Sequence, residues 1–193
     1  KKLLRNIKND KTWTKSRFLL AKKEEQKKRY NKYSNTGYLL EPNLKEGPGG
    51  FRDLQTLQWV AKRSFKAQSL ADLYNSDVIT KKEYLALLRS ERFLSKTRFL
   101  LHHINGKPEE RLYFSSQKKL SELFGYNYDS NVGVEKFMQS FYKHITNIKQ
   151  LNEILIKHIE NNINGHNKTD SKIIFNDFLV RNNTIRVGNK DIF

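Results

Sequence analysis

Residues 41–59 read EPNLKEGPGGFRDLQTLQW, and this stretch decides how the chain on either side of it is arranged. It holds two of the three prolines and three of the nine glycines. Pro48, Gly49 and Gly50 end any preceding helix, because proline lacks an N–H donor and glycine adopts backbone angles that strain other residues. Apolar residues then recur at helical spacing. The stretch therefore predicts a sharp turn followed by a helix over residues 52–65.

The turn is a candidate anion site. The first N–H groups of a helix have no partner within the helix, and the helix dipole places positive charge at the same end. Lys45 and Arg52 add two cations beside the N–H groups of Gly49 and Gly50. These four residues are the candidate phosphate-binding residues.

A structural role for the same turn remains open. A Pro-Gly-Gly turn also serves simply to connect two packed helices. In that case Pro48 shapes the turn, Asp53 stabilises the start of the helix through its charge, and Arg52 pairs with Asp53 or Glu41 to brace it. The local pattern does not separate the two roles.

Length and composition limit the classes of protein. A chain of 193 residues fits one domain with a real core. Without cysteine it has no disulfide, thiolate metal site or cysteine nucleophile. No apolar run reaches the roughly 20 residues needed to span a bilayer, and no signal peptide opens the chain. We expect a cytoplasmic protein with no membrane partner, and we interpret the start at Lys1 as the start of an excised portion.

The net charge of +17 suits nucleic acid, nucleotide phosphates or an acidic protein as a partner. The basic residues are nevertheless spread along the chain. Their densest run, residues 22–32, is interrupted by Glu24 and Glu25. This pattern is typical of a solvated helix face.

Helices are expected over most of the chain, so the fold class is all-α, a helical bundle. The first runs through Trp13 and Tyr30 to a break near residues 35–37. Thr80 and Glu83 form a capping box at the start of a long helix that ends near Gly106. Shorter helices are expected at residues 69–74 and 116–124. The longest helix carries an apolar stripe that includes Val134, Phe137, Met138, Phe141, Ile145, Ile148, Leu155 and Ile159.

The composition changes after Asn161. Residues 161–168 are polar, whereas residues 173–187 are rich in β-forming residues around Asn182 and Asn183, as in a short β-hairpin. We expect a helical domain over residues 1–162 and a boundary segment over residues 163–193 with an irregular or hairpin structure.

Residues 21–63, which include AKKEEQKKRY and LLEPNLKEGPGGFRDLQTLQWVAKR, resemble the bifunctional PII uridylyltransferase/uridylyl-removing enzymes of bacterial nitrogen sensing. RLYFSSQ, GVEKFMQSFY and LNEIL follow in the same order, so the resemblance covers nearly the whole chain. Gly49, Gly50, Arg52 and Asp53 also resemble a turn of related adenylyltransferases. Phe51 replaces the aliphatic residue usual there.

The resemblance implies a nucleotidyltransferase that moves UMP from UTP to the PII signalling protein and removes it, with glutamine as effector and magnesium as cofactor. It implies that this portion lies between the nucleotidyltransferase core and the uridylyl-removing HD domain, and forms a wall of the cleft for nucleotide or PII. The chain has no Asp-x-Asp pair to hold magnesium and no His-Asp pair. We therefore expect no catalytic or metal-binding residues here, and the metal ligands outside this chain.

A basic helical nucleic-acid-binding module is the alternative function. It requires positive charge gathered on one face together with exposed aromatic rings for stacking. Phe137, Phe141 and Trp59 instead fall on apolar stripes. The pattern therefore does not favour nucleic acid as a partner.

Overall fold

The computed structural model describes residues 13–126 and 130–163 and three short strands within residues 172–187. The chain forms two compact units, Lys1–Ile163 and Asn164–Phe193. In the part of the chain that the structure describes, no helix is long and apolar enough to cross a membrane.

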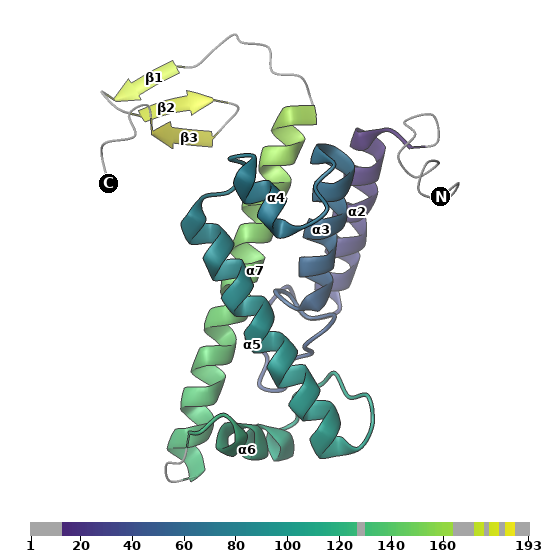
Figure 1. Ribbon diagram of the computed structural model, residues 1–193, viewed down its shortest axis with the longest axis vertical. Helices are drawn as coiled ribbons and strands as arrows, with labels where there is room; N and C mark the ends of the chain where they lie inside the picture. Colours follow the sequence, from purple (N-terminus) through teal and green to yellow (C-terminus); the bar gives the residue numbers. More distant parts are fainter. Residues whose placement is uncertain (1–12, 127–129, 164–171, 176–177, 182–183, 188–193) are drawn as a thin grey trace. The chain divides into compact units, whose positions relative to one another are not determined.

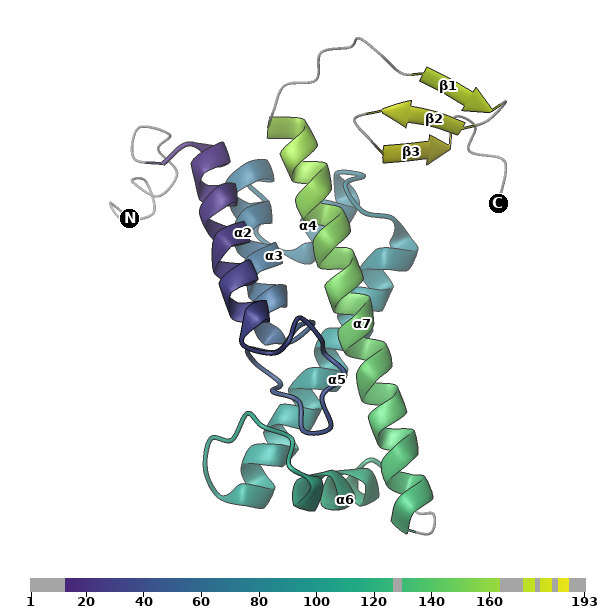
Figure 2. The ribbon, with the colours of Figure 1, turned by 180° about the vertical axis from the view of Figure 1, so that it is seen from behind.

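The first unit consists of helices, which confirms the all-α fold class (Figure 1). The long helix α7 (Ser130–Ile163) is its centre. The others are α2 (Lys15–Asn31), α3 (Phe51–Phe65), α4 (Leu70–Asn75), α5 (Lys81–Asn105) and α6 (Phe114–Leu123). Helix α7 packs against α2, α3, α5 and α6. Figure 2 shows α7 crossing in front of α5, with α2 and α3 side by side along its upper half.

Most helix ends lie close to their predicted positions, because local sequence signals specify them. The predicted capping box of Thr80 and Glu83 starts α5, and Gly106 ends that helix with a left-handed φ of 62°. A second capping box, from Ser69 and Asp72, starts α4. Helix α6 begins at Phe114, two residues before the predicted start.

The core follows the predicted stripe of α7. Phe137 and Phe141 are 0% and 1% exposed and pack among the buried leucines of α5. A smaller cluster of Leu19, Val60, Ile156 and Ile159 joins α2, α3 and α7. The assignment of Trp59 to an apolar stripe is wrong: its ring is 37% exposed, because Val60 and not Trp59 faces α7.

The second unit contains an antiparallel sheet of strands β1 (Lys172–Phe175), β2 (Phe178–Arg181) and β3 (Thr184–Val187), in that order. Strand β2 pairs with β3 from Phe178↔Val187 to Arg181↔Thr184. This pair is the expected hairpin, and β1 adds one strand to it. The predicted turn residues Asn182 and Asn183 lie outside the described residues. The role of residues 163–193 as a boundary segment stays a prediction.

Candidate functional site

The turn before α3 is held by hydrogen bonds within its own backbone and by the side chain of Asn43. The Asn43 carboxamide accepts the N–H groups of Lys45 and Glu46 at 3.0 and 2.7 Å. The Gly50 N–H donates to the Gly47 carbonyl, and the Arg52 N–H donates to the Lys45 carbonyl. Because so many bonds close within the turn, its shape does not depend on a ligand.

Gly49 sets the distance between this turn and α7. Its φ is +79°, which non-glycine residues rarely adopt, and a Cβ added there would lie 2.1 Å from the carbonyl oxygen of Ile145. Both the conformation and the close approach therefore require glycine. The turn packs directly on the backbone of α7.

Asp53 is fully buried just inside the start of α3, and its carboxylate accepts four hydrogen bonds. One oxygen accepts from Arg29 at 2.5 Å and from Gln26 at 3.1 Å. The other accepts from the Tyr30 hydroxyl at 2.5 Å and from the Gly49 N–H at 2.6 Å. Such a carboxylate is satisfied on both oxygens, so it holds α2 and the turn together and is not available as a general base.

Tyr30 stays protonated in this cluster. Burial, followed by the negative charge of Asp53, raises the pKa of the Tyr30 hydroxyl far above its ordinary value of 10.0. The hydroxyl therefore donates to the carboxylate at any physiological pH. Its role is to stabilise the buried charge of Asp53 beside Arg29.

Helix α7 joins the cluster through Asn152. The Asn152 amide donates to the Asp53 carbonyl at 2.8 Å, and its oxygen accepts from Gln26 at 2.8 Å. Arg29 also donates to the Glu46 carbonyl at 3.0 Å. Three helices and the turn are thus connected through one group of polar side chains, which we call the Asp53 cluster: Gln26, Arg29, Tyr30, Asp53 and Asn152.

The four candidate phosphate-binding residues fall into two pairs. The N–H groups of Gly49 and Gly50 are already bonded within the turn, so a phosphate would have to displace those bonds. Lys45 and Arg52 lie on the half-exposed rim. The Lys45 ammonium has no hydrogen bond or ion pair with the residues that the structure describes.

Arg52 is braced, but by neither of the two predicted partners. Its guanidinium donates to Glu46 and to Gln55, each at 2.9 Å. Asp53 pairs with Arg29 instead. Glu41 accepts from Arg111 at 2.9 Å and from the N–H of Phe114 at 3.1 Å, at the start of α6. The prediction of a brace partner at Asp53 or Glu41 is therefore wrong.

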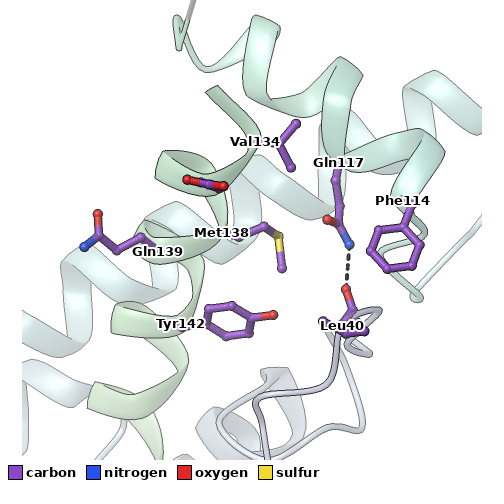
Figure 3. A pocket seen from close by; sticks show the side chains of 8 residues that line it. Leu40, Phe114, Gln117, Val134, Met138, Gln139 and Tyr142 are labelled. Carbon is purple, nitrogen blue, oxygen red and sulfur yellow. Dashed lines mark hydrogen bonds between the residues drawn. The ribbon is translucent and has the colours of Figure 1, made fainter. Parts of the chain in front are cut away.

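An apolar groove lies between Leu40, α6 and α7. It has a volume of about 430 Å³. Figure 3 shows Met138 and Tyr142 of α7 facing Phe114 across it, while the Gln117 amide donates to the Leu40 carbonyl at 2.7 Å. Both polar bonds of that amide are made to backbone carbonyls, so it braces the groove wall.

No metal centre is found among the residues whose positions are described, since none of their His, Asp and Glu side chains form a group of three suited to a metal ion. His102 lies near Glu110, and His144 bonds to Ser90 at 3.0 Å. Neither histidine belongs to such a group.

The hydrogen-bond partners of Asp53 were not predicted from the sequence. The prediction of a solvated face over residues 22–32 is wrong for Arg29, whose side chain is 7% exposed. The signal was the i, i+3, i+4 spacing of Gln26, Arg29 and Tyr30, which puts all three on one face of α2 with buried Leu19 seven residues before Gln26. Asn152 sits within the apolar stripe of α7 and had no such signal.

Comparison with known proteins defines the class to which this turn and bundle belong. The family model described as GlnD PII-uridylyltransferase matches residues 17–156. The chain therefore belongs to the GlnD PII-uridylyltransferase family, and the resemblance seen in the sequence is confirmed. No solved structure matches the chain.

The relatives described next are each named bifunctional uridylyltransferase/uridylyl-removing enzyme. The relative from Legionella pneumophila (strain Corby) is 42% identical over 94% of this chain and 21% of its own length. The relative from Methylococcus capsulatus is 44% identical over 77% of the chain and 17% of its length. The relative from Hydrogenovibrio crunogenus is 38% identical over 98% of the chain and 22% of its length. The chain thus spans about one fifth of the length of these relatives.

Proposed function

We propose that this chain is the helical part of a cytoplasmic enzyme that transfers UMP from UTP to the PII signalling protein and removes it again. Glutamine is the proposed effector, and magnesium the proposed cofactor. The support is the family match over residues 17–156 and the names of relatives that are about 40% identical.

Within that enzyme, we propose that the helical unit forms a wall of the cleft for nucleotide or PII. The observation that supports this proposal is the structure of the turn. The Asp53 cluster holds the turn rigidly, while Lys45 and Arg52 lie on its half-exposed rim. The Arg52 guanidinium is held in place by Glu46 and Gln55, so it loses less entropy when it binds phosphate. Arg52 also presents a planar guanidinium, which suits phosphate oxygens.

The chemistry itself is proposed to lie in other parts of the enzyme. Phosphoryl transfer needs carboxylates that hold metal ions, and the chain has no Asp-x-Asp pair. Asp53, which is buried, is paired with Arg29, and the partly exposed Glu41 and Glu110 are paired with Arg111 and Arg98. The chain purified alone should therefore leave PII unmodified when it is incubated with UTP and magnesium. Transfer of UMP to PII by the chain alone would contradict the proposal that the catalytic residues lie in other parts of the enzyme.

The test of the wall role uses the intact enzyme with Arg52→Gln and Lys45→Gln. A charged hydrogen bond to phosphate is worth about 1.5–3 kcal/mol, so each variant should reduce UMP transfer by roughly tenfold or more. Removal of UMP should persist. Lys62→Gln, which removes an exposed cation of the same helix α3, is the matched control and should leave both activities unchanged.

Thermal unfolding of each variant distinguishes a residue that contacts phosphate from one that only stabilises the turn. If Arg52→Gln loses both activities together with stability, the Arg52–Glu46 pair is structural and the nucleotide role is withdrawn for that residue. Full transfer activity in Lys45→Gln would withdraw it for Lys45.

A further inference from the structure

One face of α5 carries an exposed stripe that the turn and its cluster do not use. Its members recur at alternating three- and four-residue intervals along the helix, and all are exposed. We call it the basic stripe: Lys82, Leu85, Arg89, Arg92, Lys96 and Phe99.

The basic stripe lies opposite the face by which α5 packs into the core. Leu87, Leu94 and Leu101 are each 0% exposed and belong to the main core cluster. Residues at the spacing of the stripe fall within an arc of about 100° on the other side of the helix. Figure 1 shows α5 in front of α7, and Figure 2, from behind, shows α7 in front of α5. The stripe therefore lies on the exposed side of α5, with Lys96 at its edge over the Phe124 ring at 4.2 Å.

The charge of the stripe is of one sign. Four of its six residues are cations, and none of the four forms an ion pair with a described residue. The two acidic residues of α5 lie off the stripe: Glu83 bonds back to Thr80, and Glu91 lies outside the arc. Four unneutralised cations along one line favour an anionic partner.

Two apolar side chains interrupt the cations. Leu85 is 41% exposed, and the Phe99 ring is 71% exposed near the far end of the helix. A solvated helix face has no need of an exposed phenylalanine, whereas an aromatic ring that enters a pocket is a common anchor of protein interfaces.

We propose that the basic stripe docks an acidic helix of a protein partner, with Leu85 and Phe99 as its apolar anchors. The alternating three- and four-residue spacing is the spacing by which two helices pack along a shared seam. The stripe from Lys82 to Phe99 is about 25 Å long at 1.5 Å per residue, enough for a partner helix of four to five turns. Acidic residues flanking the partner's seam would pair with Arg89, Arg92 and the two lysines.

Nucleic acid is the other polyanion to consider. The stripe partly meets the requirement for it, since it gathers positive charge and an exposed ring on one face. Leu85 lies midway between Lys82 and Arg89, however, and an aliphatic side chain there gains nothing from a phosphate backbone. One aromatic ring also provides no row of stacking surfaces for successive bases. The interleaved apolar residues therefore favour a protein helix.

The test measures binding of two labelled probes to the intact protein by fluorescence anisotropy. One probe is a synthetic helical peptide with leucine at heptad positions and glutamate beside them. The other is a short DNA duplex. Arg89→Glu/Arg92→Glu should weaken peptide binding by about tenfold or more, because two attractive charges become repulsive. Phe99→Ala should weaken it by about fivefold.

The matched controls make the same kinds of substitution, charge reversal and truncation to alanine, on helix α2. Lys27→Glu/Lys28→Glu reverses two exposed cations of α2, and Leu20→Ala truncates an exposed apolar side chain that is 55% accessible. Both should change peptide binding by less than about twofold. Circular dichroism of each variant verifies that the helices remain.

Three results would overturn the proposal. Equal losses for the α5 and α2 charge reversals would mean that the peptide responds only to the net charge. Tighter binding of the duplex, lost in Arg89→Glu/Arg92→Glu, would make the stripe a nucleic-acid surface. No binding of the peptide to the intact protein would mean that the stripe does not accept an acidic helix.

Discussion

The Arg29 guanidinium donates a 2.5 Å hydrogen bond to the Asp53 carboxylate, and both side chains are buried. This pair joins α2 to the first turn of α3, across a glycine turn that touches α7. It explains why the most distinctive stretch of the sequence lies in the interior of the unit: the turn is a joint between three helices. The cations that remain on its rim are Lys45 and Arg52.

Asp53→Asn should be strongly destabilising although it keeps the shape of the side chain. It leaves the Arg29 charge buried without a counter-ion, which costs about 3–5 kcal/mol of unfolding free energy. Urea unfolding measures the difference. Asp77→Asn is the control, because Asp77 is exposed and asparagine tolerates its positive φ of 52°. A loss at Asp53 no larger than at Asp77 would show that the pair contributes little.

Gly49→Ala should cost more stability than Gly106→Ala. Both glycines have positive φ, 79° and 62°, so each substitution should cost roughly 1–2 kcal/mol in backbone strain. Only at Gly49 does the new methyl group meet the carbonyl of Ile145, and overpacking should add about 1–3 kcal/mol. At Gly106 nothing lies within 4 Å. Equal losses in chemical denaturation would argue against the close approach of turn and helix.

Phe141→Ala should reduce the unfolding free energy by about 3–5 kcal/mol, because its ring is 1% exposed in the main core cluster. Phe99→Ala removes the same side chain from a position that is 71% exposed, so it should change stability by less than about 0.5 kcal/mol. Thermal or urea unfolding of the two variants compares them directly. Similar losses would mean that the stripe of α7 is not the centre of the core.

His144 should make stability depend on pH. Burial, followed by the charges of Lys143 and Arg89, lowers the pKa of the imidazole below its ordinary value of 6.5. Its ring stacks on Phe93 at 4.4 Å and bonds to Ser90. The unfolded chain therefore binds the proton more readily. The stability contributed by neutral His144 is complete above pH 6.5 and decreases as the pH falls toward the lower folded-state pKa.

Unfolding free energies measured on both sides of pH 6.5 test this effect. His144→Gln should show a smaller loss of stability in acid than the unmodified protein. His158→Gln, at an exposed position of α7, should retain the full loss. An unchanged acid dependence in His144→Gln would assign the effect to other groups.

Local sequence signals were sufficient for the helices. Thr80 and Glu83 satisfy each other's free N–H groups within one turn of chain, so the start of α5 could be read without any tertiary contact. Phe137 and Phe141 lie four residues apart on a stripe long enough to define the face of α7 that is buried. Such signals are local because the groups that make them are neighbours in the sequence.

By itself, the sequence determined the helical class, the family and the glycine turn, since each depends on residues close together in the chain. Tertiary structure alone decided which side chains meet there. Arg29 and Asp53 are 24 residues apart, Asn152 is a further 99 residues away, and Gly49 contacts Ile145. A buried charge takes the counter-ion that packing brings within hydrogen-bonding distance, and no local pattern specifies that choice.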